Sequence, residues 1–151
     1  MSFGPSSKEV TSQFHTYQIT ETTTCQNKVK PRPPINQTKC WNPYVPVTYS
    51  LANEQGKIVY NGIVPTLFDS GGYDTHLLLP KIPPKLKQFV KNGFLKGKVK
   101  SAYFSKDNYP IPTTNEVKVS QQKKLEVNSG HNLFYNKAVL FDSANGIVGV
   151  K

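Results

Sequence analysis

The sequence predicts an all-β domain with one or two short helices. Twelve prolines and ten glycines supply frequent turn signals. Eight tyrosines and eight phenylalanines, beside a single methionine, suit strands better than a helical bundle. Several segments also alternate polar and apolar residues between those turns. With 151 residues, the chain is long enough to bury one core, so we expect a single domain over 1–151.

The first half of the chain predicts strands over 14–24, 44–51, 57–60 and 63–68. A Pro-rich stretch over 24–46 is expected to form a long loop or a hairpin tip. Turns are expected at Asn53-Glu54-Gln55-Gly56 and at Asn61-Gly62, because Asn-Gly between apolar runs is a strong hairpin signal.

The second half begins with a different periodicity. Pro83-Pro84 precedes apolar residues at 86, 89, 90 and 94, a spacing that predicts a helix over about 84–94 with proline at its start. Strands are expected over 97–104, 116–119 and 124–127. A helical turn at about 131–136 then leads to a final hairpin, whose arms flank Asn145-Gly146.

Charge limits the partners that we expect. Nineteen basic against nine acidic residues give a net charge of +10, and seven lysines lie between Lys81 and Lys100 without an acidic residue. Such a run suits either a polyanion-binding surface or a solvated outer face. Few aromatic residues alternate with these lysines, which favours the solvated face, so no nucleic-acid partner is expected. No apolar run approaches the ~20 residues that span a bilayer.

The cysteines and histidines indicate a compartment rather than a metal site. Cys25 and Cys40 lie in the Pro-rich segment and could form one disulfide, although two reduced cysteines remain an alternative. Asn36-Gln37-Thr38 fits a glycosylation acceptor, and both features favour a secreted or extracytoplasmic protein. The N-terminus lacks a signal-peptide pattern. The spacing of the histidines and cysteines fits no metal site, and no cofactor is expected.

The candidate site is the segment Leu67-Phe68-Asp69-Ser70-Gly71-Gly72, in which an apolar strand ends in a carboxylate on a tight turn. By itself this pattern is an ordinary β-turn. Further segments that belong to one recognisable pattern follow one another, in the order of that pattern, along nearly the whole chain. Together they resemble the C-terminal lobe of a pepsin-like aspartic protease, and the matching segments are Ser2-Phe3-Gly4, Trp41–Val47, Tyr60-Asn61-Gly62, Leu79-Pro80, the 84–94 helix and Gly130–Val150.

The resemblance implies a closed, orthogonal β-barrel lobe in which Asp69 is one of two catalytic carboxylates. Two close carboxylates that share a proton supply both a base and an acid for peptide hydrolysis, and the aspartic proteases are the standard example of such a pair. Ser70 would tie two active-site turns together, Gly71 would let them pack, and Gly72 with Tyr73 would border the substrate cleft. The chain departs from the family at Gly72, where the family usually has a hydroxyl that braces the carboxylate, and at Asn128-Ser129, where it has an apolar pair.

One matching Asp-Ser-Gly supplies half of such a site, since the resemblance makes Asp142 a non-catalytic residue. The other carboxylate would come from a missing N-terminal lobe or from a second copy of the chain. The start of the chain at the first strand of the lobe, without a signal peptide, favours the missing lobe. The expected function is therefore an aspartic endopeptidase acting on peptide substrates. The alternatives are a non-catalytic pepsin-like binding protein and a basic module that binds polyanions.

Overall fold

The structure, a computed structural model, describes residues 8–22, 40–112 and 116–151. Contacts between Cα atoms divide the chain into two compact units. The terminal unit comprises Met1–Pro43 and Ala138–Lys151, and the central unit comprises Tyr44–Lys137. Both are built mainly from strands, which confirms the expected all-β class.

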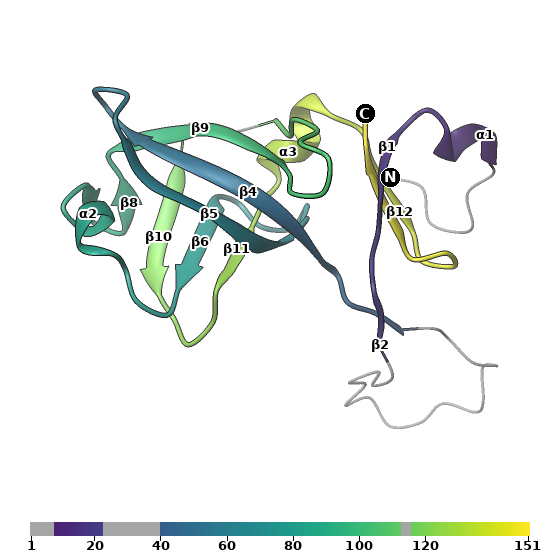
Figure 1. Cartoon of the computed structure of the whole chain (residues 1–151), viewed down its shortest axis with the longest axis horizontal. Coiled ribbons are helices and arrows are strands. Elements are labelled where there is room, and N and C mark those ends of the chain that lie inside the picture. Colours follow the sequence, from purple (N-terminus) through teal and green to yellow (C-terminus); the bar gives the residue numbers. More distant parts are fainter. Residues whose placement is uncertain (1–7, 23–39, 113–115) are drawn as a thin grey trace. The chain divides into compact units, whose positions relative to one another are not determined.

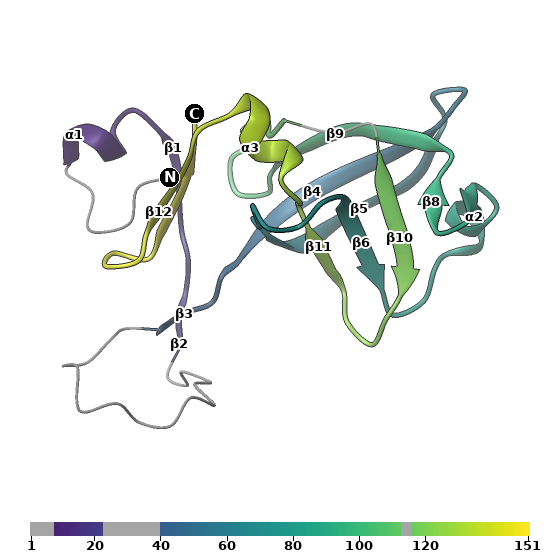
Figure 2. The same ribbon diagram turned by 180° about the vertical axis from the view of Figure 1, so that it is seen from behind.

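The central unit contains a mixed eight-stranded sheet with the order β7-β8-β10-β6-β11-β5-β4-β9 (Figures 1 and 2). Two one-turn helices accompany it, α2 at Pro84–Lys87 and α3 at Asn132–Asn136, the second of which confirms the expected helical turn. The strands are β4 Tyr44–Asn53, β5 Ile58–Leu67, β6 Thr75–Leu79, β7 Val90–Lys91, β8 Phe94–Leu95, β9 Gly97–Phe104, β10 Val117–Gln121 and β11 Glu126–Asn128.

The sheet is open, whereas the resemblance implied a closed barrel. Strands β7 and β9 are its two edges among the described residues. Beyond β9 there is an isolated bridge between Tyr103 and Pro110. Its two backbone hydrogen bonds run from Phe104 N to Tyr109 O at 2.9 Å and from Ile111 N to Ala102 O at 2.8 Å.

The longest pairing is the β4–β5 hairpin, whose register runs from Tyr44 opposite Leu67 to Ala52 opposite Ile58. Its turn lies at Asn53–Gly56, as expected. The Asn53 side-chain oxygen accepts hydrogen bonds from two backbone N–H groups in the turn, and Gly56 supplies a positive φ of 78°.

The second turn expected in this region, at Asn61-Gly62, is wrong. Both residues lie inside β5, opposite Ser50 and Tyr49 of β4. Ser50 Oγ donates a hydrogen bond to Asn61 Oδ1 across the two strands, at 3.3 Å. The strand therefore continues because the earlier turn has already set its register along β4.

The expected helix over 84–94 is also wrong beyond its first turn. Helix α2 ends at Lys87, and β7 and β8 then form a small hairpin. Asn92 and Gly93, between these strands, have φ values of 53° and 80°. Two consecutive positive φ values define the type I′ turn that Asn-Gly favours, and they are incompatible with a right-handed helix. Leu86 is completely buried, so the apolar spacing reflected one anchoring side chain rather than a long helical face.

The centre of the sheet holds an arrangement that the sequence did not predict. Strand β11 lies between β5 and β6, parallel to the first and antiparallel to the second. Strand β6 in turn pairs in parallel with β10, with Thr75 opposite Val117. The segment 68–74, which connects β5 to β6, must therefore pass around the end of β11, and this end is where the candidate site lies.

Glu126 of β11 is a buried carboxylate in this sheet. Its Oε2 accepts a hydrogen bond from the Tyr44 hydroxyl at 2.8 Å and lies 2.6 Å from Lys124 Nζ. Burial, followed by this hydrogen bond to Glu126, raises the pKa of Tyr44. The carboxylate is thus paired, as a buried charge must be.

The terminal unit contains a three-stranded sheet of order β1-β13-β12 and a short β2–β3 pair. The final hairpin forms as expected, and its loop is organised by Asp142, whose carboxylate accepts hydrogen bonds from Ala144 N, Asn145 N and Asn145 Nδ2. The Trp41 indole donates to Ser143 O at 2.6 Å and lies over Gly146. The elements are α1 Lys8–Thr11, β1 His15–Gln18, β2 Glu21–Thr22, β3 Cys40–Trp41, β12 Val139–Asp142 and β13 Ile147–Val150.

The expected Cys25–Cys40 disulfide stays a prediction, because Cys25 lies outside the described residues. Within the described ranges, no helix is long and apolar enough to cross a membrane.

Candidate active-site turn

Asp69 follows β5 directly, at the point where the chain leaves the sheet. The preceding residue, Phe68, is buried and meets Phe104 edge to face with 6.2 Å between ring centroids. The Asp69 backbone N–H donates to Ser129 Oγ at 3.2 Å. The apolar anchor and this hydrogen bond fix the start of the turn, which leaves the carboxylate at its partly exposed rim.

Both carboxylate oxygens of Asp69 are held by N–H donors. Gly71 N donates to Oδ1 at 2.9 Å, and Asn128 Nδ2 donates to Oδ2 at 2.8 Å. Donors of this kind stabilise the ionised form. The hydrogen bond from Asn128, followed by that from Gly71, therefore lowers the pKa of Asp69 below its ordinary value.

The end of β11 cross-links this turn to the sheet. Ser129 N donates to Leu67 O, and Thr75 Oγ1 donates to Ser129 O at 2.8 Å. On the other side, His131 N donates to Gly72 O at 2.7 Å. The turn is thus attached, before and after the carboxylate, to the residues that follow β11 directly.

Gly130 allows this close approach. Its φ is 63°, and a Cβ atom there would lie 2.6 Å from Asp74 O and 2.7 Å from Asp74 C. A glycine is required at this position for both its backbone conformation and its lack of a side chain.

The site residues expected from sequence, Asp69 to Tyr73, all lie on this one turn. Ser70 and Gly71 are exposed, and Tyr73 is 79% exposed with its ring 5.1 Å from that of His131. Sequence reasoning missed Asn128 as a partner of the carboxylate. The signal that could have found it is the polar residue at 128, where the resembling family has an apolar one.

A pocket of about 230 Å³ adjoins the turn, lined by Gly72, Tyr73, Asp74, His76, Lys118 and Asn128. His76 Nε2 lies 2.7 Å from Ser120 Oγ. Burial and the nearby charge of Lys118 lower the pKa of His76, while Asp74 and Glu126 act in the opposite direction. These effects together favour the uncharged form of His76, and Lys118 contributes a basic side chain to the pocket lining.

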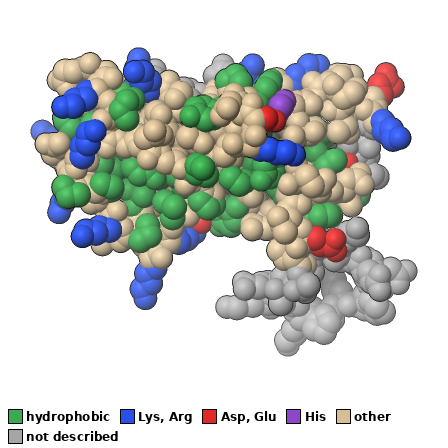
Figure 3. Space-filling view, viewed as in Figure 1, with side chains coloured by type: hydrophobic (Ala, Val, Ile, Leu, Met, Phe, Trp, Pro, Cys, Tyr) green, Lys and Arg blue, Asp and Glu red, His purple; other side chains and the backbone are tan. Residues whose placement is uncertain are grey.

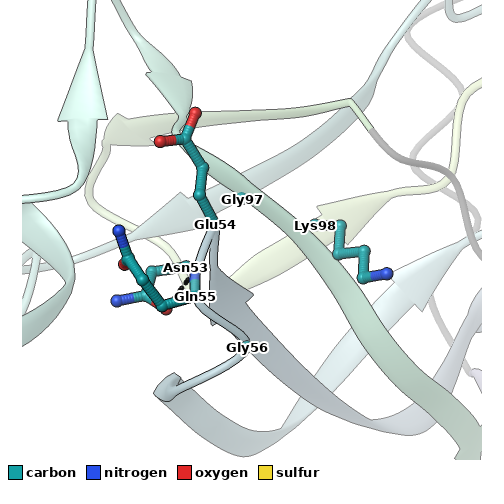
Figure 4. A pocket seen from close by; sticks show the side chains of 6 residues that line it. All are labelled: Asn53, Glu54, Gln55, Gly56, Gly97 and Lys98. Carbon is teal, nitrogen blue, oxygen red and sulfur yellow. Dashed lines mark hydrogen bonds between the residues drawn. The ribbon is translucent and has the colours of Figure 1, made fainter.

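A larger pocket of about 610 Å³ lies at the β4–β5 turn (Figure 4). In Figure 4, the Glu54 and Lys98 side chains point away from each other. The Asn53 side-chain oxygen is already used by the turn itself. The polar side chains that line this pocket do not converge as they do beside Asp69.

On the face shown in Figure 3, Lys and Arg side chains lie mostly near the outline, with one within the face beside an acidic side chain and a histidine. Apolar side chains gather across the middle of this face. Lys98 and Lys100 are exposed on either side of the buried Val99 of β9, as in a strand with one solvated face. Across the described part of the chain, no group of three or more His, Cys, Asp or Glu residues could hold a metal ion.

In comparisons with known proteins, no family model, no curated protein and no solved structure matches the chain.

Proposed function

We propose that this chain is a pepsin-like lobe that contributes Asp69 to an aspartic endopeptidase site, with the second carboxylate supplied by another lobe or by a second copy. The observation that carries the proposal is the Asp69 carboxylate itself. It is partly exposed, lies on a turn attached to β11, and has an N–H donor on each oxygen. Asp142 accepts comparable hydrogen bonds, but its side chain is buried and organises its own loop.

The proposed reaction is the hydrolysis of a peptide bond by water. One carboxylate takes a proton from water as the oxygen attacks the carbonyl carbon, and the other, protonated carboxyl gives its proton to the carbonyl oxygen. As the resulting diol collapses and the C–N bond breaks, the carboxyl that took the proton from water gives it to the departing nitrogen. The other carboxylate takes the proton of a diol hydroxyl, which restores the starting pair. The products are one carboxylic acid and one amine.

The hydrogen bonds around Asp69 favour it as the base of the proposed carboxylate pair. Two neighbouring carboxylates share one proton because both cannot ionise cheaply, and the proton stays on the group with the higher pKa. Hydrogen bonds from Asn128 and Gly71 lower the pKa of Asp69. The lowered pKa of Asp69 therefore favours its ionised form, which is the form that a general base requires.

The pocket beside the turn fits the substrate side of the proposal. Gly72 and Tyr73, which the resemblance assigns to the cleft, line it together with Asn128, whose amide holds Asp69. A substrate side chain in this pocket would lie beside the proposed base, and its walls carry Lys118 and Asp74 as charged groups.

The test compares cleavage of a denatured protein by the longest natural form of the chain and by its Asp69→Asn variant, at acid and neutral pH. Loss of the base is expected to lower cleavage by at least about 100-fold. Asp107→Asn is the matched control, because Asp107 is exposed and its Oδ1 also accepts a backbone N–H two residues on, from Tyr109. The control is expected to cleave like the natural chain.

Cleavage that survives in Asp69→Asn, or that is equally lost in Asp107→Asn, would reject the proposal. The source of the second carboxylate follows from the concentration dependence. If a second copy supplies it, activity per chain rises with protein concentration until the dimer is saturated. If another lobe of the same protein supplies it, activity per chain stays constant.

A further inference from the structure

We propose that Asn128 is the positioning residue of Asp69 and that Gly72 is its necessary counterpart. In this pair, a side-chain amide from β11 braces the carboxylate, in place of a hydroxyl on the turn itself. The effect on catalysis rests on the proposed function, whereas the bracing can be tested without it.

The orientation of the Asn128 amide follows from its two partners. Its Oδ1 accepts a hydrogen bond from Gly130 N at 2.9 Å. Since a backbone N–H can only donate, this contact requires the oxygen on that side. The NH₂ group is thereby directed to Asp69 Oδ2, 2.8 Å away. An amide does not titrate at ordinary pH, so the brace persists whether Asp69 is ionised or not.

Gly72 leaves the space that this amide occupies. A Cβ atom at position 72 would lie 2.9 Å from Asn128 Oδ1 and 3.3 Å from Gly130 Cα. The Asn128 oxygen also accepts the hydrogen bond from Gly130 N. A side chain at position 72 would therefore push against this oxygen and strain its hydrogen bond with Gly130 N.

The same geometry shows how the two positions could be exchanged. The Cβ at position 72 would also lie 3.4 Å from Asp69 Oδ2. A serine hydroxyl extends one bond further and could donate to that oxygen, provided that the side chain at position 128 is small. Gly72 and Asn128, where the chain departs from the family that it resembles, are thus one coupled change rather than two separate losses.

The test uses the full chain in four forms: natural, Asn128→Ala, Gly72→Ser, and the double variant Gly72→Ser with Asn128→Ala. The Asp69 carboxyl is titrated by carbon NMR, and thermal unfolding reports whether each form is folded. Asn128→Ala is expected to raise the pKa of Asp69 towards that of an ordinary aspartate. The double variant is expected to lower it again, and Gly72→Ser alone is expected to lower the unfolding temperature.

Asn61→Ala is the matched control, because the Asn61 side-chain amide also makes a hydrogen bond across two strands but lies within β5, away from the turn. It should leave the titration of Asp69 unchanged. If Asn128→Ala does not fold, the isosteric Asn128→Asp takes its place, and its second carboxylate should raise the pKa of Asp69.

An unchanged Asp69 titration in a folded Asn128 variant, or no recovery in the double variant, would overturn the inference. In the active form, the acid limb of the pH–rate profile should move to higher pH in Asn128→Ala and return in the double variant. If Asp69→Asn leaves cleavage intact while the NMR result holds, the proposed function fails and the bracing stands.

Discussion

Replacing Gly130 by alanine is expected to destabilise the central unit by about 4 kcal/mol or more, which is exceptional for the addition of one methyl group. The φ of 63° alone costs an alanine about 1–2 kcal/mol. The larger cost comes from the Cβ atom, which would lie 2.6 Å from Asp74 O and 2.7 Å from Asp74 C. Since both atoms belong to backbone, the connection between β5 and β6 would have to shift away from β11.

Urea unfolding measures this cost, and Gly93→Ala is the matched control. Gly93 also has a positive φ, 80°, in the central unit, but no heavy atom lies within 4 Å of a Cβ there. The control should lose about 1 kcal/mol from its backbone conformation. Equal losses in the two variants would show that the close approach of Gly130 to Asp74 contributes nothing.

Gly97→Ala is expected to have a comparable effect at the other end of the sheet, again about 4 kcal/mol or more. Gly97 begins β9 opposite Asn53. Its φ is 154°, and a Cβ atom would overlap Ala52 O and lie 2.8 Å from Asn53 Cα. To relieve this overlap, the end of β9 must separate from β4, which breaks the edge of the sheet.

The control for Gly97 is Gly56→Ala, in the neighbouring β4–β5 turn. Gly56 has a φ of 78°, and a methyl group added there would meet open space. Its loss should be limited to about 1–2 kcal/mol. Thermal unfolding of the two variants beside the natural chain measures the difference, and a Gly97→Ala variant as stable as Gly56→Ala would refute the prediction.

The two Asn-Gly pairs show how far local sequence determines the strands. Asn92-Gly93 forms the turn that its residue types favour, although the apolar spacing around it suggested a helix. Asn61-Gly62 does not form a turn, because the Asn53–Gly56 turn has already aligned β5 with β4. Local propensity is the same in both cases, and long-range pairing decides between the outcomes.

The residues of the candidate site show the same contrast between local sequence and long-range pairing. Asp69 to Tyr73 could be assigned to one turn because they are adjacent in sequence and follow an apolar strand. Asn128 could not be assigned to the carboxylate in this way, since it lies 59 residues further along the chain. Its contact depends on the parallel register of β11 on β5, with Asn128 opposite Leu67, and periodicity carries no information on that register.

The position of β11 between β5 and β6 has a consequence for the order of folding. The β4–β5 hairpin closes through a short local turn, and hairpins of this kind form in about 1–10 μs. The contact of Asp69 with Ser129 must instead bring together residues 60 positions apart, against the entropy of closing a long loop.

In pulse-labelling hydrogen exchange, the Asp69 amide should therefore gain protection together with Ser129 and later than the amides of β4. Simultaneous protection of Asp69 and β4 would contradict this order. A nascent or truncated chain that ends before residue 128 would carry Asp69 without the Asn128 amide, so one oxygen of its carboxylate would lack the donor that holds it in the folded unit.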